Sequence, residues 1–386
     1  MRKYKIIISG GGTGGHLFPA LTIANEIKNH FPEADILFVG AENRMEMERV
    51  PAAGYRIIGL PVTGFDRKNP LKNISVICRL IKSLRIAKKI IRDFIPDIAI
   101  GVGGYASGPT LWMASLLRIP VLIQEQNSYA GLTNKLLGKR AAKICVAYKG
   151  MEKYFHEDRI VITGNPVRKE LELIQGKISE AFTYFGLESG KPVLLILGGS
   201  LGARTINNSI RKGLKTLMDA GVQIIWQTGR MMKNYELRIT NDESEELKGN
   251  YELRITNYES EKLKSEGVWC SDFIARMDYA YMVADLVISR AGACTLSELC
   301  LLKKAALLVP SPNVAEDHQT KNARTLSENN AAVLILDKVA EEQLVPAAID
   351  LLKNNRRLSE LSENIALNAQ HNSAKRIVDE VIKIIS

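Results

Sequence analysis

Ser9-Gly10-Gly11-Gly12-Thr13-Gly14-Gly15-His16, close to the start of the chain, holds five glycines and a histidine in eight positions. The run follows a short apolar segment, Tyr4–Ile8, and precedes apolar residues at helical spacing that begin near Leu21. A strand, a glycine-rich turn and a helix N-terminus form an anion site, because residues without a Cβ let backbone N–H groups approach a ligand and point at it. His16 is then expected beside whatever binds there.

Three interpretations of this run compete. Gly10, Gly12 and Gly15 match the dinucleotide fingerprint G-x-G-x-x-G. That fingerprint is completed by an acidic residue at the end of the second strand, and here the nearest candidate after the segment 35–40, Glu42, comes late. A Walker A loop would need Gly-Lys-Ser/Thr, which the run lacks. A tight turn without a ligand is the third interpretation, but the titratable His16 favours a functional site.

Length and composition indicate an ordinary globular protein. The 386 residues suit two domains, and 46% of them are hydrophobic and 24% charged. We expect neither a signal peptide nor a membrane span, since no apolar run approaches about 20 residues. The five cysteines are scattered and never spaced C-x-x-C, which argues for a reducing cytoplasm and against disulfides or a zinc site.

The net charge of +10 predicts an acidic partner. Nucleic acid, anionic lipid and phosphorylated substrates are all acidic partners of this kind. No nucleic-acid-binding motif is present, so no nucleic-acid partner is expected.

Short β-rich runs alternate with helical patterns through the first half of the chain, which predicts a parallel sheet with helices on both faces. The expected strands are 6–8, 36–39, 57–60, 98–102, 121–124, 144–146 and 159–162. Ligands bind at the carboxyl ends of such strands. Polar and glycine-rich segments do follow three of them, at 10–16, 103–109 and 125–127.

A second α/β series follows a turn at 163–168. It opens with the strand 193–197 and a second glycine-rich loop, 198–204. The fold class is therefore α/β, with two Rossmann-like, doubly wound parallel-sheet domains facing a cleft. We expect domain boundaries at 1–167 and 168–367, with a C-terminal helix, about 368–386, packing back on the first domain.

Residues 235–266 hold a duplication. Tyr-Glu-Leu-Arg-Ile-Thr-Asn stands at 235–241 and again at 251–257. A solenoid needs three or more repeats to bury a core. Two charged copies predict a surface insertion without chemistry.

The helical segment 71–94 is amphipathic and basic. Its apolar arc consists of Ile74, Ile77, Leu80, Ile81, Leu84 and Ile91, and its cationic arc of Lys82, Arg85 and Lys89 with Arg79 at the margin. Such a helix either packs its apolar arc on the sheet or rests on an anionic membrane surface. Only apolar residues that the sheet does not use could enter lipid.

Six motifs stand in an order that resembles glycosyltransferase family 28. They are the runs 11–16, 103–109, 125–127, 164–168, 198–203 and 289–298. The resemblance covers nearly the whole chain except 235–266. It implies the GT-B fold and an inverting hexosyltransferase. Family members of this kind move N-acetylglucosamine from UDP-N-acetylglucosamine to the muramoyl 4-hydroxyl of undecaprenyl-pyrophosphoryl-N-acetylmuramoyl-pentapeptide, in peptidoglycan synthesis.

The resemblance also implies which residues bind the UDP-sugar. Ser200 and the helix N-terminus at 292–295 would contact the diphosphate, Glu298 the ribose hydroxyls, and the Ile274 backbone with Arg168 the uracil. Gln319 and Asn127 would reach the sugar. The full set of expected donor contacts is Thr13, Gly14, Gly15, Asn127, Arg168, Ser200, Ile274, Ala293, Cys294, Thr295, Leu296, Ser297, Glu298 and Gln319. His318 and Leu201 stand where many relatives have Gln.

The chemistry needs a base and a site for the leaving phosphate. A sugar hydroxyl is a poor nucleophile, and His16 and Glu125 are the candidate bases. Helix dipoles and backbone donors can stabilise the departing UDP. No Asp-x-Asp metal motif occurs, so neither metal nor cofactor is expected. Amides at the two N-terminal glycine loops would bind the acceptor pyrophosphate, with Gly12, Gly104, Tyr105 and Ser107 as the expected contacts.

A lipid-linked acceptor favours the membrane interpretation of segment 71–92, which places the protein peripherally at the cytoplasmic face of the cell membrane. Two alternatives stay open. One is another sugar-nucleotide enzyme of this fold, such as an epimerase or a different glycosyltransferase. The other is a nicotinamide-binding oxidoreductase built on the first loop.

Overall fold

The chain forms two compact units in a computed structural model. Unit 1 is Met1–Lys169 with Gln370–Ser386, and unit 2 is Glu170–Ala369. The structure describes residues 3–64, 73–168, 171, 174, 176–199, 202–229, 266–314 and 317–386. Ser200, Leu201 and the duplicated insertion, apart from Glu266, lie outside these ranges.

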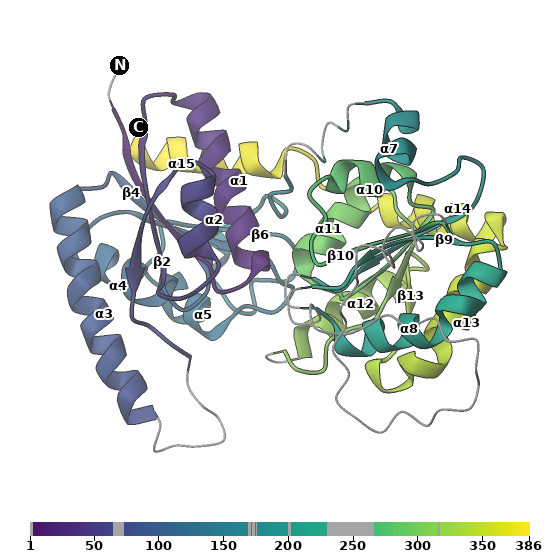
Figure 1. Cartoon of the computed structure of the whole chain (residues 1–386). Helices are drawn as coiled ribbons and strands as arrows, with labels where there is room; N and C mark the ends of the chain where they lie inside the picture. The colour runs from purple at the N-terminus through teal and green to yellow at the C-terminus, as the bar shows by residue number, and fades with distance from the viewer. Residues whose placement is uncertain are drawn as a thin grey trace. The chain divides into compact units, whose positions relative to one another are not determined.

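Unit 1 contains a parallel sheet in the order β3-β2-β1-β4-β5-β6-β7 (Figure 1). The strands are β1 (Lys5–Gly10), β2 (Asp35–Ala41), β3 (Arg56–Leu60), β4 (Ile98–Gly103), β5 (Val121–Glu125), β6 (Lys143–Val146) and β7 (Ile160–Ile162). The helices are α1 (Gly14–His30), α2 (Glu46–Ala52), α3 (Asn73–Phe94), α4 (Ser107–Leu116), α5 (Leu132–Gly138) and α15 (Ser373–Ile385), with a short 3₁₀ turn η2 (Glu157–Arg159). The strand order reverses beside β1, so the loops after β1 and β4 meet at the switch point.

Strand β1 is buried on both faces because successive side chains point to opposite sides of the sheet. Ile6 and Ile8 pack with α1 and with Ile377 and Val381 of α15. Ile7 packs in the cluster on the other face, with residues of α3, α4 and α5. The predicted packing of the C-terminal helix on the first unit is confirmed, and Figure 1 shows α15 in yellow beside α1.

The absence of a side chain at Gly164 leaves space for the segment that leads back to unit 1 and into α15. Its φ is +84°, and a Cβ there would lie 2.4 Å from Ser373 Oγ and 2.6 Å from Gln370 Oε1. The Gln370 amide donates to the Ala147 carbonyl at 2.8 Å. The turn chemistry at 163–168 therefore fixes the segment that leads into α15.

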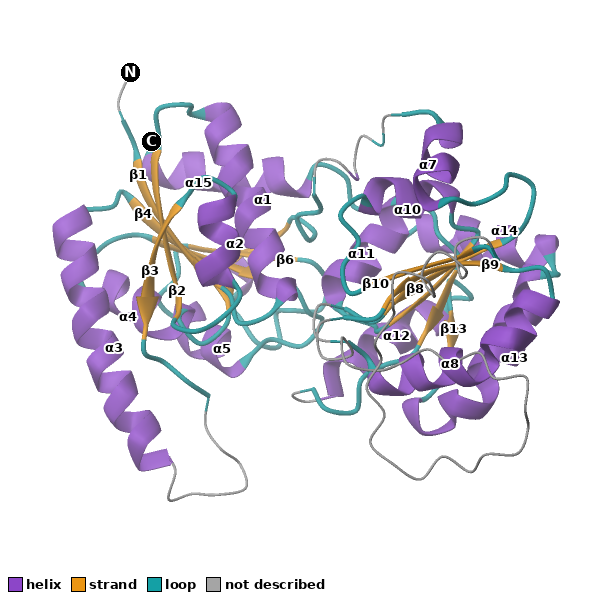
Figure 2. Ribbon diagram, viewed as in Figure 1, coloured by secondary structure: helices purple, strands orange, loops and turns teal. Residues whose placement is uncertain are grey.

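Unit 2 repeats the architecture with a parallel sheet in the order β10-β9-β8-β11-β12-β13 (Figure 2). Its strands are β8 (Val193–Leu197), β9 (Gln223–Gln227), β10 (Val268–Ser271), β11 (Leu286–Ser289), β12 (Ala306–Leu308) and β13 (Val333–Leu334). Its helices are α7 (Ile178–Phe185), α8 (Arg204–Asp219), α10 (Met277–Val283), α11 (Ala293–Leu301), α12 (His318–Glu328), α13 (Ala340–Leu352) and α14 (Asn355–Ala366), with the 3₁₀ turn η5 (Asp337–Val339).

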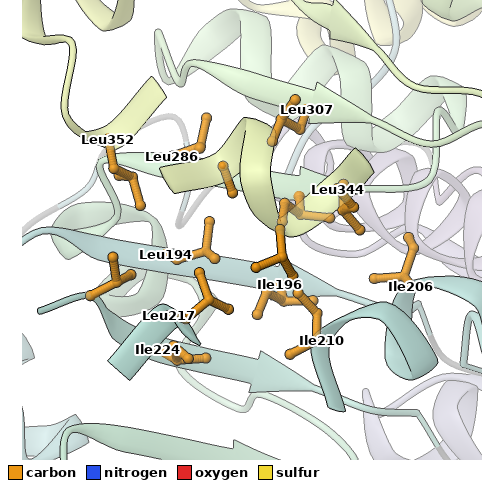
Figure 3. Packing of buried hydrophobic residues seen from close by; sticks show 14 of the residues in the cluster. Leu194, Ile196, Ile206, Ile210, Leu217, Ile224, Leu286, Leu307, Leu344 and Leu352 are labelled. Atoms are coloured by element: carbon orange, nitrogen blue, oxygen red, sulfur yellow. The ribbon is translucent and has the colours of Figure 1, made fainter. Parts of the chain in front are cut away.

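Leucine and isoleucine side chains fill one face of the second sheet (Figure 3). Leu194 and Ile196 of β8 meet Ile206 and Ile210 of α8 and Leu344 of α13 in one buried cluster. Both predicted sheets are thus confirmed, and in each unit a glycine loop follows the carboxyl end of a central strand, β1 in unit 1 and β8 in unit 2.

Helix α3 buries only part of its apolar arc. Its buried residues are Val76, Ser83, Ala87, Ile90 and Ile91. Ile74, Ile77 and Ile81 are 64%, 48% and 46% exposed. The apolar arc is thus divided: Ile91 is buried, whereas Ile74, Ile77 and Ile81 are left exposed by the packing of the helix. Among the described helices, none is long and apolar enough to cross a membrane.

Candidate functional site

The first glycine loop packs backbone against backbone at the switch point of unit 1. Gly11 and Gly12 have φ values of +150° and +84°, and Gly103 and Gly104 of +98° and +89°. A Cβ on Gly104 would lie 2.4 Å from the Gly11 carbonyl oxygen. Glycine is required here because any side chain would separate the two loops.

His16 lies in the first turn of α1, against the second of these loops. Its Nδ1 is 3.2 Å from Thr13 Oγ1, and its backbone N–H donates to the Thr13 carbonyl at 3.2 Å. A Cβ on Gly103 would lie 2.8 Å from His16 Nε2, so this glycine makes room for the ring. The imidazole is half-buried. Thr13 and the two glycine loops thus hold a titratable group at the carboxyl edge of the sheet.

Glu46, the first residue of α2, is a part of this loop that sequence reasoning missed. Its side chain is fully buried. Oε2 accepts from the Gly12 N–H at 2.8 Å, and Oε1 accepts from the Ala41 N–H at 3.0 Å. The Gly12 amide, expected to meet the acceptor, therefore bonds to a carboxylate of the protein. The only sequence signal was an acid four residues beyond Glu42.

Glu125, at the end of β5, is buried and surrounded by donors. Oε1 lies within hydrogen-bond distance of the Asn127 backbone N–H (3.0 Å) and its Nδ2 (3.3 Å). Oε2 accepts from the Gly131 N–H at 3.1 Å and Asn134 Nδ2 at 2.8 Å. This carboxylate orders the loop from β5 to α5 and holds Asn127 in place.

The remaining predicted acceptor contacts differ in exposure. Ser107 is buried, and its Oγ is 2.7 Å from the Ser9 carbonyl oxygen and 2.9 Å from that of Gly103. Tyr105 is half-exposed, and its ring lies over Gly64. Ser107 therefore supports the ends of β1 and β4, whereas Tyr105 presents its ring at the surface.

A buried amide network joins β5 to the segment that ends unit 1. Gln124 donates to Asn165 Oδ1 at 3.0 Å, and Asn165 donates to the Gln126 carbonyl at 3.1 Å. Gln126 donates to the Val102 carbonyl and to Gln124 Oε1. Buried polar groups need such partners, so these amides fix the loops around Glu125. Just beyond them, the Arg168 guanidinium lies 5.2 Å from the centre of the Phe18 ring.

In unit 2 the glycine loop after β8 again meets a neighbouring backbone. Gly199 and Gly202 have φ values of +73° and +91°. A Cβ on Gly229, after β9, would lie 2.2 Å from the Gly202 nitrogen. Ser200, expected at the diphosphate, lies outside the described residues.

Helix α11 begins directly after β11, with Gly292 as its N-cap. Ala293 and Leu296 are buried, whereas Cys294, Thr295, Ser297 and Glu298 are partly buried. Glu298 Oε2 accepts a hydrogen bond from the Tyr281 hydroxyl at 2.9 Å. The positive end of the helix dipole and the first N–H groups make this terminus a ready anion site.

Arg290, inside the same motif, was not among the predicted site residues. Its Nη1 donates to the carbonyls of Val309 and Pro310, each at 3.1 Å, and pairs with Asp337. Asp337 also accepts from the Thr205 hydroxyl at 3.0 Å. Arg290 therefore ties together the segments after β11 and β12, η5 and the start of α8.

Two further predicted donor contacts of unit 2 are Ile274, in a loop, and Gln319, in the first turn of α12. Ile274 is buried, in the segment between β10 and α10. Nearby, Arg276 pairs with Asp278 at 2.6 Å, and its hydrogen bond holds the Asp278 pKa below the ordinary value. Gln319, in α12, accepts from the Ser311 N–H at 2.8 Å. Its amide oxygen therefore orders the loop after β12.

Two thiols of unit 2, those of Cys270 and Cys300, are poor nucleophiles. Burial raises the pKa of Cys270 and of Cys300 to about 12 each. A thiol with such a pKa stays protonated at neutral pH.

Both halves of the chain match the models of one protein family. Residues 6–146 match the glycosyltransferase family 28 N-terminal domain, and residues 193–380 match the family 28 C-terminal domain. A UDP-N-acetylglucosamine–N-acetylmuramyl-(pentapeptide) pyrophosphoryl-undecaprenol N-acetylglucosamine transferase from Parabacteroides distasonis is 60% identical over 385 residues, covering 100% of this chain and 99% of the relative. A transferase with the same name from Cytophaga hutchinsonii is 50% identical over 385 residues, covering 100% of this chain and 98% of the relative.

Solved structures share the architecture. MurG of Acinetobacter baumannii has a TM-score of 0.70 at 25% identity, covering 99% of this chain and 100% of the other. A UDP-N-acetylglucosamine 2-epimerase has a TM-score of 0.62 at 15% identity, covering 99% and 96%, and this likeness concerns the fold alone. Because both family domains match in order and full-length relatives are 50–60% identical, the chain belongs to glycosyltransferase family 28.

Proposed function

We propose that this protein transfers N-acetylglucosamine from UDP-N-acetylglucosamine to the muramoyl 4-hydroxyl of undecaprenyl-pyrophosphoryl-N-acetylmuramoyl-pentapeptide, which converts lipid I to lipid II in peptidoglycan synthesis. The observation that carries the proposal is the full-length identity of 60% to a relative named for this reaction. The two glycine-loop sites supply chemistry that suits it, namely a titratable imidazole in unit 1 and a helix N-terminus in unit 2.

His16 is the base in this proposal. It is half-buried, and Thr13 orients its Nδ1, so Nε2 can take the proton of the acceptor hydroxyl as the new bond forms. Glu125 is the weaker candidate because four donor groups surround its carboxylate and burial separates it from solvent. We assign Glu125 the task of positioning Asn127. Amides around Gly104, with Tyr105, would receive the acceptor pyrophosphate.

Unit 2 binds the donor in this proposal. The N-terminus of α11, at residues 293–297, receives the diphosphate, together with the loop after β8 that includes Ser200. As the sugar departs, negative charge grows on the β-phosphate, and the helix dipole stabilises it. Glu298, oriented by Tyr281, accepts the ribose hydroxyls. Within this unit, Gln319 would bind the sugar and the Ile274 backbone the uracil. Thr13, Gly14, Gly15, Asn127 and Arg168, which belong to unit 1, remain predicted donor contacts.

We further propose that α3 carries unit 1 to the cytoplasmic face of the membrane. Ile74, Ile77 and Ile81 form an exposed stripe at helical spacing. Six exposed cations share the helix: Arg79, Lys82, Arg85, Lys88, Lys89 and Arg92. Apolar side chains flanked by Lys and Arg suit the headgroup region of an anionic bilayer.

Helix α4, which packs against α3, extends the exposed apolar surface. Trp112 and Leu116 are 37% and 50% exposed, and the Arg140 guanidinium lies 4.7 Å from the centre of the Trp112 ring. A tryptophan beside a cation is typical of a membrane interface.

The reaction is tested by incubating the purified protein with radiolabelled UDP-N-acetylglucosamine and a detergent-solubilised polyprenyl-pyrophosphoryl-muramoyl-pentapeptide. We expect label in the lipid-linked product and release of UDP. Conversion of the UDP-sugar to its 2-epimer, or its hydrolysis without use of the acceptor, would contradict the assignment. The oxidoreductase alternative predicts a fluorescence change on adding NADH. We expect none, because Glu42 comes late after β2 for a ribose contact, and both carboxylate oxygens of Glu46 already accept from backbone N–H groups.

The membrane contact is tested separately with vesicles that contain phosphatidylglycerol. The double variant Ile77→Ser/Ile81→Ser should sediment less with the vesicles, while its activity on the detergent-solubilised acceptor stays unchanged. Ile178→Ser, a similarly exposed position on α7, is the matched control. Equal sedimentation of all three proteins would refute the contact.

A further inference from the structure

Glu46 is a fully buried charged side chain, and both its carboxylate oxygens accept hydrogen bonds from backbone N–H groups. Its partners are the Gly12 N–H in the loop after β1 and the Ala41 N–H at the end of β2. A buried carboxylate carries a large desolvation cost unless donors compensate it. Two charge-assisted bonds from rigid backbone give that compensation.

The surrounding glycines make room for this side chain. A Cβ on Gly11 would lie 2.4 Å from Glu46 Oε1, and one on Gly40 would lie 2.6 Å from its Cγ. The carboxylate is therefore inserted between the β1 loop and the end of β2. On the other side of the same loop, Gly104 touches Gly11.

The anchored peptide is adjacent to the residue that orients the imidazole. Gly12 directly precedes Thr13, whose carbonyl accepts from the His16 N–H and whose Oγ1 is 3.2 Å from His16 Nδ1. A shift of the Gly12 peptide would move Thr13 and so turn or displace the ring over Gly103. A displacement of about 1 Å can lower a reaction rate about 100-fold.

We propose that Glu46 is a positioning residue of the transfer reaction. Its carboxylate clamps the Gly11-Gly12 backbone and thereby holds His16 in the orientation in which it takes the acceptor proton. This inference rests on the proposed function for its kinetic consequences, but the clamp itself is a property of the fold.

The substitution Glu46→Gln tests the two hydrogen bonds that the carboxylate accepts, while it leaves the packing of the side chain nearly unchanged. Glutamine has almost the same shape, but it offers one oxygen and one NH₂ group, so one of the two backbone N–H groups would face another donor. Glu46→Asp keeps the charge on a shorter side chain. Glu48→Gln, on the exposed face of the same helix, is the matched control.

The experiment measures kcat and KM for UDP-N-acetylglucosamine in the full-length variants, with hydrogen–deuterium exchange of the peptide that covers residues 10–17. For Glu46→Gln we expect kcat to fall roughly 10- to 100-fold, KM for the donor to stay within about two-fold, and exchange of the loop amides to accelerate. Glu48→Gln should match the wild type in all three measurements. A purely structural role would lower thermal stability without this loss of kcat.

Folded Glu46→Gln with wild-type kcat, or with a raised donor KM and unchanged kcat, would overturn the proposal. If Glu46→Gln does not fold, Glu46→Asp replaces it, and an unchanged kcat in that variant would overturn the proposal equally. A wild-type protein that transfers no sugar would refute the proposed function instead. Loop exchange would then still decide the clamp, since unchanged exchange in Glu46→Gln would exclude it.

Discussion

The two glycine loops, 10–16 in unit 1 and 198–203 in unit 2, use the same backbone device in different ways. Each follows a central strand and touches a neighbouring loop without side chains between them, at Gly11–Gly104 in unit 1 and at Gly202–Gly229 in unit 2. In unit 1 the partner loop follows β4, at the switch point, and Glu46 holds the opposite flank. In unit 2 the partner loop follows β9, and β11 on the other side leads into α11.

Under the proposed function, the first loop presents a side chain, His16, whereas the second loop leaves its backbone N–H groups for a ligand. The first loop is clamped on both flanks and ends in His16. In the described part of the second, residues 198–199 and 202–203 are glycine or alanine, and Arg204 follows as the first residue of α8. Under the proposed function, the same strand–loop–helix frame serves proton transfer in one unit and anion binding in the other.

The sharpest way to break this comparison is to remove the imidazole. His16→Ala should lower kcat by about 10²- to 10⁴-fold, because general-base catalysis contributes on that scale, and should leave UDP affinity unchanged. Transfer kinetics measure kcat, and calorimetric titration with UDP measures the affinity. His30→Ala, exposed at the end of the same helix, should behave as the wild type. A His16→Ala protein with full kcat would remove the proposed base.

A substitution in unit 2 should instead weaken donor binding. Glu298→Ala should weaken UDP-N-acetylglucosamine binding about 10- to 100-fold, since hydrogen bonds to a charged group contribute about 1.5–3 kcal/mol. Tyr281→Phe removes only the hydroxyl that orients Glu298 and should have a smaller effect. Binding is measured by titration calorimetry. Loss of kcat with unchanged affinity would place Glu298 outside the donor site.

The backbone contacts can be compared by adding one methyl group in each unit. Gly104→Ala would place a Cβ 2.4 Å from the Gly11 oxygen at a φ of +89°. Gly199→Ala would meet the same kind of strain, at a φ of +73°, with no atom of the described residues within 4 Å. We expect Gly199→Ala to lower the free energy of unfolding by about 1 kcal/mol from backbone strain alone. Gly104→Ala should lower it by about 2–4 kcal/mol, because overpacking adds to the strain. Urea denaturation compares the two variants, and equal losses would show that the Gly11–Gly104 contact is loose.

The smallest expected effect concerns pH. The Arg276 hydrogen bond lowers the Asp278 pKa from its ordinary value of 3.8. Because the folded-state pKa is lowered, the contribution to stability is present above the unfolded-state pKa and is lost as the pH falls through the folded-state value. Asp278→Asn should therefore melt slightly below the wild type at pH 7, and the difference should shrink as the pH falls below 3.8 and through the lowered folded-state pKa. A difference that persists in acid would show that the side chain acts through packing.

Most of the fold and part of the site could be predicted from sequence. The strands of a parallel sheet buried on both faces form continuous apolar runs, such as 6–8 and 193–197, and the glycines that end them mark the ligand edge. The proximity of His16 to Gly103 follows from the same rule, because both lie at carboxyl ends of neighbouring strands.

What could not be predicted depends on contacts between distant segments. Glu46 bonds to backbone N–H groups, which carry no sequence signal, and it lies 34 residues from Gly12. Arg290 likewise bonds mostly to carbonyls. The orientation of α3 could not be derived from its helical wheel, since Ser83 and Ala87 are buried while the larger Ile74, Ile77 and Ile81 are exposed.

The position of α15 has a consequence for synthesis of the protein on the ribosome. Unit 2 is one uninterrupted segment, 170–369, whereas unit 1 receives Ile377, Val378 and Val381 only after that segment has been translated. At about 5–20 residues per second, the sheet of the nascent first unit therefore waits roughly 10–40 s for α15 to pack on it. Ile6 and Ile8 remain partly open to water during this interval, so unit 2 can finish folding first although it is made second.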